Sequence, residues 1–155
     1  MTDALPVRKT NGGFRIRLGL GATIFGFLLY MLGAEPGLFS LDRSPVVGFV
    51  QIATFLVGLG FICLGGYISL ASLWNGGSKS IASDIGLRLV CTGYVIAVAC
   101  GMADIFGFGS NNYPTIPIFG FYQQLGVIIG ELVIGVGLVL LVPFKRPKPQ
   151  IGELQ

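Results

Sequence analysis

The chain contains no histidine among its 155 residues. It therefore has no ligand for a His-ligated haem, chlorophyll or zinc site, and no histidine for acid or base catalysis. Its three cysteines, Cys63, Cys91 and Cys100, form no C-x-x-C pair, so we expect them to be small packing residues. No phosphate-binding loop, dinucleotide fingerprint or metalloprotease motif occurs either. We therefore predict that the protein uses no cofactor or metal and is not an enzyme.

Charge is also scarce, because Asp, Glu, Lys and Arg make up 11% of the chain while apolar residues make up 53%. A soluble domain has about 25% charged residues, so this composition predicts an integral membrane protein. Four apolar stretches reach the roughly 20 residues that a helix needs to cross a bilayer, at about 18–34, 46–74, 87–108 and 118–144. None alternates like a barrel strand, and helices satisfy their own backbone groups in lipid. We predict an all-α protein with four transmembrane helices.

Basic residues lie almost entirely on one side of these helices. Nine of the ten occur before the first helix, between the second and third, or after the fourth: Arg8, Lys9, Arg15, Arg17, Lys79, Arg88, Lys145, Arg146 and Lys148. Only Arg43 lies on the other side. Because short loops rich in Lys and Arg stay in the cytoplasm, we predict that both termini are cytoplasmic, in a plasma or inner membrane. The net charge of +3 follows from this topology, so we expect no nucleic-acid partner.

Part of the sequence recurs 72 residues later. This register aligns Pro45–Gln51 with Pro117–Gln123, Gly58 with Gly130 and Gly65 with Gly137. A neighbouring register, shorter by one residue, aligns Arg17 with Arg88 and Met31 with Met102 in the first and third helices. Because each copy contains two helices, both copies enter and leave on the same side. We predict two tandem parallel hairpins, 14–74 and 80–144, in one membrane domain (1–155) that ends in a cytoplasmic tail (145–155).

Small residues recur on one face of the helices, where they let backbones approach closely. We expect ten of them to pack helices together: Gly48, Gly58, Gly65, Gly93, Ala97, Gly101, Gly120, Gly126, Gly130 and Gly137. Helices two and four are expected to pack along this stripe, with packing on each other as one option. The other interpretation is a polar pocket lined by Gln51 and Gln123.

Two carboxylates fall within the predicted spans. Asp104 lies near the outer end of the third helix, where Gln51, Gln123, water or Arg43 would hold it. Glu131 lies about 21 Å along the fourth helix from Pro117, far from either surface. Intramembrane carboxylates often mark proton or cation sites, and a structural hydrogen bond is the alternative for both. The candidate site comprises Glu131, Asp104, Gln51, Gln123 and Gln124.

A chain this short, with glycine-rich interfaces, has little room for its own substrate machinery. We therefore predict an accessory or structural subunit of a larger membrane complex or a homo-oligomer, with lipids and other membrane subunits, or copies of itself, as partners. The alternative is a small proton- or cation-coupled transporter that uses Glu131 and Asp104. A third interpretation is an enzyme acting on lipid or quinone at the outer surface. It has in its favour only Asp104 and the aromatic residues around the second outer loop: Phe106, Phe108, Tyr113, Phe119, Phe121 and Tyr122.

Overall fold

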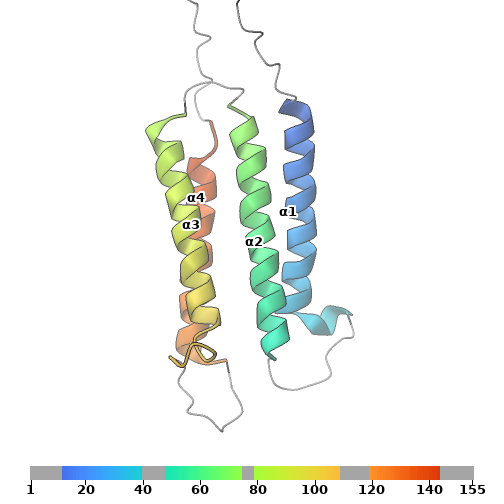
Figure 1. The fold of residues 1–155 in the computed structure, drawn as a ribbon, viewed down its shortest axis with the longest axis vertical. Coiled ribbons are helices and arrows are strands. Elements are labelled where there is room, and N and C mark those ends of the chain that lie inside the picture. Colours follow the sequence, from blue (N-terminus) through green and yellow to red (C-terminus); the bar gives the residue numbers. More distant parts are fainter. Residues whose placement is uncertain (1–11, 40–47, 75–78, 109–118, 144–155) are drawn as a thin grey trace, which may run out of the picture.

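The computed structural model describes residues 12–39, 48–74, 79–108 and 119–143. These residues form four long α-helices and one short 3-10 helix (Figure 1). They are α1 Gly12–Ala34, η1 Pro36–Phe39, α2 Phe49–Ser72, α3 Ile81–Gly101 and α4 Phe121–Leu140. The four α-helices have mean hydropathies from 1.6 to 2.0. The prediction of an all-helical chain with four helices long and apolar enough to span a membrane is confirmed.

The helix boundaries differ from those that hydropathy predicts. α1 starts at Gly12 rather than near residue 18, and α3 spans 81–101 rather than 87–108, while α2 and α4 each start three residues late. At the start of α3, the side chain of Ser80 accepts a hydrogen bond from the backbone N–H of Ser83 at 3.2 Å. This N-cap lets the helix begin within a polar segment. After α3 the chain turns, and Gly107 adopts a φ of 79° that glycine tolerates without steric cost.

α1 and α2 run antiparallel and pack through their backbones. A Cβ added at Gly26 would lie 2.7 Å from the carbonyl oxygen of Gly58, and one added at Gly65 would lie 2.5 Å from that of Gly19. The buried residues of α1 are spaced seven apart: Gly19, Gly26 and Gly33. A heptad spacing keeps one seam directed at the neighbouring helix. Because the seam lacks side chains, the two backbones come into direct contact.

α3 and α4 form a second pair of the same kind. A Cβ added at Gly93 would lie 2.6 Å from the carbonyl oxygen of Gly130, and one added at Gly137 would lie 2.7 Å from that of Gly86. The buried residues of α4 follow alternate spacings of four and three: Gln123, Val127, Gly130, Ile134 and Gly137. This is the spacing of a coiled-coil seam, so the second pair is also held along its whole length.

The glycine stripe of α2 thus faces α1, and that of α4 faces α3. The option that the two stripes pack on each other is wrong. The reason is that α1 and α3 carry glycines at matching heptad positions, which sequence inspection of α2 and α4 alone does not reveal. Other predicted packing residues lie elsewhere. Gly101 lies against Leu56 of α2 and Gly126 against Cys100 of α3, whereas Gly48 has nothing within 4 Å of its Cβ position. Gly120 is the N-cap of α4.

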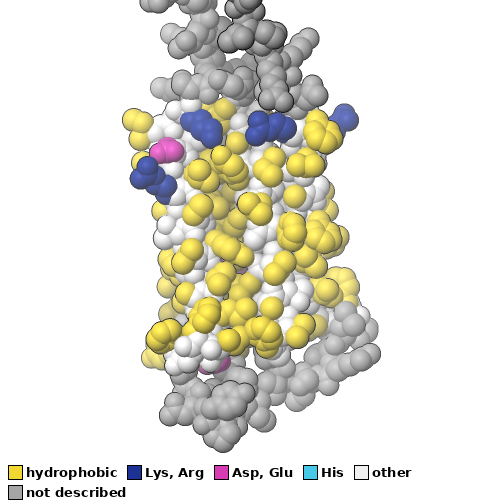
Figure 2. All heavy atoms as spheres, in the orientation of Figure 1, with side chains coloured by type: hydrophobic (Ala, Val, Ile, Leu, Met, Phe, Trp, Pro, Cys, Tyr) yellow, Lys and Arg dark blue, Asp and Glu magenta, His cyan; other side chains and the backbone are white. Residues whose placement is uncertain are grey.

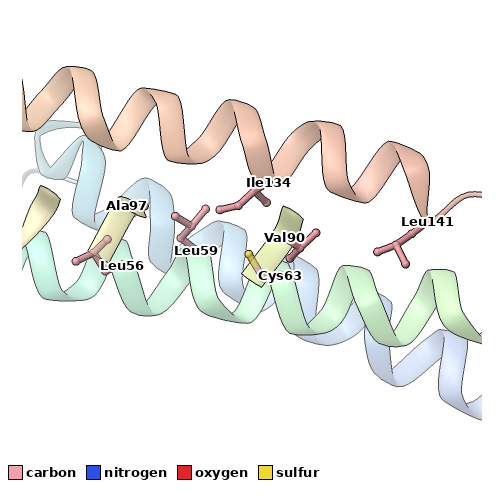
Figure 3. Close-up of a cluster of buried hydrophobic side chains, with 7 residues drawn as sticks. All are labelled: Leu56, Leu59, Cys63, Val90, Ala97, Ile134 and Leu141. Carbon is pink, nitrogen blue, oxygen red and sulfur yellow. The ribbon is translucent and has the colours of Figure 1, made fainter. Parts of the chain in front are cut away.

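The two pairs touch each other much less than the helices within each pair do, mainly through α2. The core between them is a cluster of apolar side chains, drawn in Figure 3: Leu56, Leu59, Cys63, Val90, Ala97, Ile134 and Leu141. In this view Ile134 of α4 points toward Leu59 of α2. The apolar contact between the pairs is therefore concentrated in a narrow strip of side chains.

Aromatic donors add directional bonds to this strip. The indole Nε1 of Trp74 donates to the carbonyl oxygen of Leu141 at 3.1 Å. The hydroxyl of Tyr94 donates to the carbonyl oxygen of Leu56 at 3.3 Å. Both acceptors are main-chain oxygens at positions on α2 or just after α4. These bonds fix how the pairs sit on each other, since apolar contacts alone set no direction.

On the face drawn in Figure 2, hydrophobic side chains cover most of the helices, and the basic side chains lie together at one end. The described basic residues gather there: Arg15, Arg17, Lys79 and Arg88. We call this the basic end of the bundle. Arg88 pairs with Asp84 at 3.3 Å, but both side chains are exposed, so the pair contributes little.

Candidate functional site

Glu131 lies in the middle of α4, on the flank that faces the first pair. Its Oε1 accepts a hydrogen bond from the hydroxyl of Tyr30 on α1 at 3.0 Å. Both side chains are half-buried. The bond joins α1 to α4, two helices with few other contacts, so it bridges the two pairs at mid-depth in the bundle.

The helices place these side chains through their seams. Glu131 directly follows Gly130, whose Cβ position would lie 2.8 Å from the backbone nitrogen of Ala97. Tyr30 follows Gly26 by four residues, one turn farther along α1. Because both seams hold the backbones in direct contact, the two side chains leave their helices from fixed positions. The backbones of α1 and α4 are not in close contact, and the long side chain of Tyr30 reaches across to Glu131.

Glu131 has no basic partner among the described residues, whose cations all lie at the basic end. An ionised carboxylate at the centre of a membrane helix costs about 3 kcal/mol. One hydrogen bond from a neutral hydroxyl offsets about 1 kcal/mol of this. Burial of the carboxyl group is therefore compensated only if it binds a proton, a cation or a further hydrogen-bond donor.

The surroundings of the pair are aromatic on one side and open on the other. The ring of Tyr30 packs on that of Phe55, with 4.8 Å between the ring centroids. One turn beyond Glu131, a Cβ added at Gly135 would meet nothing within 4 Å. One turn before it, Ile128 is 43% exposed. Glu131 is thus bonded to α1 on one side, while α4 is exposed one turn before it and one turn beyond it.

Asp104 lies in the turn after α3. The prediction placed it inside the third helix, which ends earlier, at Gly101. Its Oδ1 is buried and has no hydrogen-bond partner within the described part of the chain. Neither Gln51 nor Gln123 therefore holds this oxygen, contrary to one of the expectations above. Arg43, another expected partner, lies outside the described residues.

Gln123 is only 6% exposed and serves the start of α4. Its Oε1 accepts a hydrogen bond from the backbone N–H of Gly120 at 2.7 Å, which satisfies a free amide at the helix terminus. This bond fixes the orientation of the amide and leaves Nε2 buried without a partner among the described residues. Gln123 thus has a capping role that the sequence pattern did not suggest.

The remaining candidates lie apart from Glu131. Gln51 is half-buried in the first turn of α2, and Gln124 is exposed. Gln124 precedes Glu131 by seven residues, about 10 Å along the helix. Asp104 lies beyond the end of α3 that neighbours the start of α4, so it is a separate position from Glu131. Within the described ranges, no three His, Cys, Asp or Glu side chains gather as metal ligands do.

Comparison with known proteins gives no match: no protein-family model, no curated protein and no solved structure matches the chain. The fold and the site nevertheless define a class. Over the described residues, four helices have the length and apolarity of membrane-spanning helices, and the carboxyl group of Glu131 bridges the two helix pairs.

Sequence reasoning missed Tyr30 and the seam glycines of α1 and α3, namely Gly19, Gly26, Gly33 and Gly86. The heptad spacing of the α1 glycines was a usable signal. Nothing in the sequence distinguished Tyr30, because a tyrosine near the end of an apolar stretch is common at membrane interfaces.

Proposed function

We propose that this chain is an accessory or structural membrane subunit that packs laterally against other subunits or against copies of itself. The observation behind the proposal is the surface of α1, which buries only its three seam glycines within the chain. On the opposite side of α1, a Cβ added at Gly21 would meet nothing within 4 Å. Exposed apolar residues surround it: Leu18, Ile24, Phe25 and Leu28.

The physical reason concerns what glycine does in a membrane helix. Apolar side chains gain nothing by leaving lipid for another helix, so association depends on close packing, which glycine permits. A glycine inside a helix costs about 1 kcal/mol relative to alanine. At Gly21 no close contact with the rest of the described chain offsets this cost. A neighbouring subunit that packed against Gly21 would offset it.

The test is retention of partners after gentle solubilisation, followed by native mass spectrometry. Wild-type protein is expected to keep a partner or to form an oligomer. Gly21→Leu is expected to lose it, and the control Val95→Leu, at an exposed position of α3, is expected to keep it. A wild-type monomer without partners, or unchanged retention in Gly21→Leu, would contradict the proposal.

We further propose that the helices form two tandem parallel hairpins related by duplication. The matching seams support this, because Gly58 meets the nitrogen of Tyr30 as Gly130 meets that of Ala97. Gly26 of α1 and Gly93 of α3 are equivalent seam positions, because they meet the carbonyl oxygens of Gly58 and Gly130. They are 67 residues apart, four fewer than the 71 residues that separate Arg17 from Arg88 in the sequence alignment. A slip of about one turn keeps small residues on the same face, which explains how the sequence suggested the other register.

Both termini are proposed to be cytoplasmic, in a plasma or inner membrane, on the strength of the basic end. A single cysteine introduced as Lys79→Cys in a variant without native cysteines tests this. We expect a membrane-impermeant thiol reagent to label it only in inverted vesicles. Labelling in intact cells would show that the orientation is the reverse of the one proposed.

A second candidate is a small proton- or cation-coupled transporter that uses Glu131, with Asp104 as a second position. The Tyr30–Glu131 hydrogen bond favours it, because it places a carboxyl group between two helix pairs that touch weakly. Glu131→Gln is expected to abolish flux in proteoliposomes without loss of folding. Equal flux in Glu131→Gln and wild-type protein would exclude this mechanism.

A further inference from the structure

We propose that Glu131 and Tyr30 form a binding site for a monovalent organic cation that carries apolar groups. The inference rests on the second candidate function and names its class of substrate. It starts from the carboxyl group of Glu131, which has one oxygen bound to Tyr30 at 3.0 Å and no cation among the described residues. A cationic ligand would supply the charge that the site lacks.

The donor set favours an organic cation over a metal ion. Calcium takes six to eight oxygen ligands and magnesium six, while this site offers one carboxyl group and one hydroxyl. Among the described residues, no cluster of three acidic or sulfur ligands adds to them. An organic cation needs no such shell, because its charged atom already has its full set of covalent bonds.

The residues around Glu131 suit those substituents. The rings of Tyr30 and Phe55, tilted by 44° to each other, present aromatic surface beside the carboxyl group, and aromatic faces attract organic cations. Ile128 offers exposed apolar surface one turn away. Gly135 leaves space one turn beyond the carboxyl group, since a Cβ there would meet nothing within 4 Å.

The equivalent position on the other side of the bundle is apolar and closed. There, Leu59 follows Gly58 and Ala97 occupies the place of Tyr30 in the seam. Both belong to the buried core cluster, and Ala97 is 0% exposed. α2 and α3 close against each other on that side, while α1 and α4 meet through the Tyr30–Glu131 bond. The side with the carboxyl group is the open one.

The test uses purified full-length protein in nanodiscs and tetraphenylphosphonium as the probe. We expect saturable binding by wild-type protein, and at least about thirtyfold weaker binding by Glu131→Gln because a buried charge loses its partner. Tyr30→Phe is expected to weaken binding about fivefold through loss of one hydrogen bond. Gly135→Leu is expected to abolish it by filling the space, with no change of charge.

Two controls separate binding from partition into lipid and from misfolding. Tetraphenylborate has the same shape and the opposite charge, and should show no saturable binding. Asp84→Asn removes an exposed carboxylate at the basic end and should bind as wild type does. Circular dichroism of each variant verifies its helical content, and Glu131→Asp should retain binding within about tenfold because the charge remains.

Binding that is absent from wild-type protein, or equal in wild-type and Glu131→Gln protein, would overturn the proposal. A flux assay distinguishes this failure from that of the transport function. Glu131-dependent proton flux without probe binding would leave transport standing and refute the substrate class. Glu131-dependent probe binding without flux would support the site and refute transport.

Discussion

Leu59 and Glu131 occupy equivalent places on α2 and α4. Each directly follows a seam glycine, Gly58 or Gly130, whose Cβ position meets a backbone nitrogen of the paired helix. Leu59 is buried in the apolar cluster, whereas Glu131 accepts a hydrogen bond from Tyr30. The same relationship links the partners, since Ala97 and Tyr30 provide those two backbone nitrogens. One backbone arrangement thus carries an apolar contact on one side of the bundle and a polar bridge on the other.

This relationship predicts that the polar bridge is dispensable for folding. The double variant Tyr30→Phe with Glu131→Leu removes both polar partners of the bridge and keeps the ring at position 30 that packs on Phe55. We expect its free energy of unfolding to lie within about 1 kcal/mol of wild type, because replacing both partners of a polar pair by apolar groups is nearly neutral. Unfolding in mixed micelles, followed by circular dichroism, measures this.

The single variants are expected to differ from the double. Tyr30→Phe leaves Glu131 without its donor and should destabilise by about 0.6 to 1.5 kcal/mol. A double-mutant cycle of Tyr30→Phe, Glu131→Leu and the two combined is then expected to give a favourable coupling energy between residues 30 and 131. Additive effects in the cycle would show that the hydrogen bond contributes nothing to stability.

The seam glycines are expected to tolerate no side chain. A Cβ at Gly130 would lie 2.7 Å from the carbonyl oxygen of Gly93 and 2.8 Å from the nitrogen of Ala97. Because both are backbone atoms, α3 and α4 must separate, and Gly130→Ala should cost about 1–3 kcal/mol.

Gly135→Ala is the matched control, at an open position one and a half turns away on the same helix. It should be neutral or stabilise by up to about 1 kcal/mol, since alanine favours the helix. Equal effects of the two substitutions would mean that the seam is looser than its geometry indicates.

Trp74 is expected to hold the two pairs together at the basic end. Trp74→Phe keeps most of the ring but removes the Nε1 donor to the carbonyl oxygen of Leu141. The buried carbonyl group then lacks this partner, so we expect a loss of about 1–3 kcal/mol. The neighbouring, more exposed Leu73 provides the control, and Leu73→Phe should change stability by less than about 0.5 kcal/mol.

The start of α3 should depend on its cap. Ser80→Ala removes the acceptor of the Ser83 amide and is expected to cost about 1 kcal/mol. Ser80→Asp keeps an acceptor at the N-cap and should retain wild-type stability. Amide hydrogen exchange in the first turn of α3 would report the same order, with faster exchange in the alanine variant. If all three proteins exchange alike, the cap is not what sets the helix start.

The sequence by itself determined the class of the fold. Four long apolar stretches and scarce charge require helices in lipid, because only intrahelical hydrogen bonds satisfy the backbone there. It also marked Glu131 as exceptional, since an acidic residue deep in an apolar stretch is costly. Both conclusions depend on composition and position along the chain, which a sequence states directly.

Only the tertiary structure decided which helices pair and which side chain meets Glu131. The glycines of α2 fit any helix with a small-residue stripe, and it is the matching heptad of α1 that selects their partner. Tyr30 is 101 residues from Glu131 in the chain. Its role depends on the angle between two helix pairs, which is set by the packing of Leu59, Ile134 and their neighbours. Helix propensity and hydropathy are local properties, whereas that angle is a property of the whole bundle.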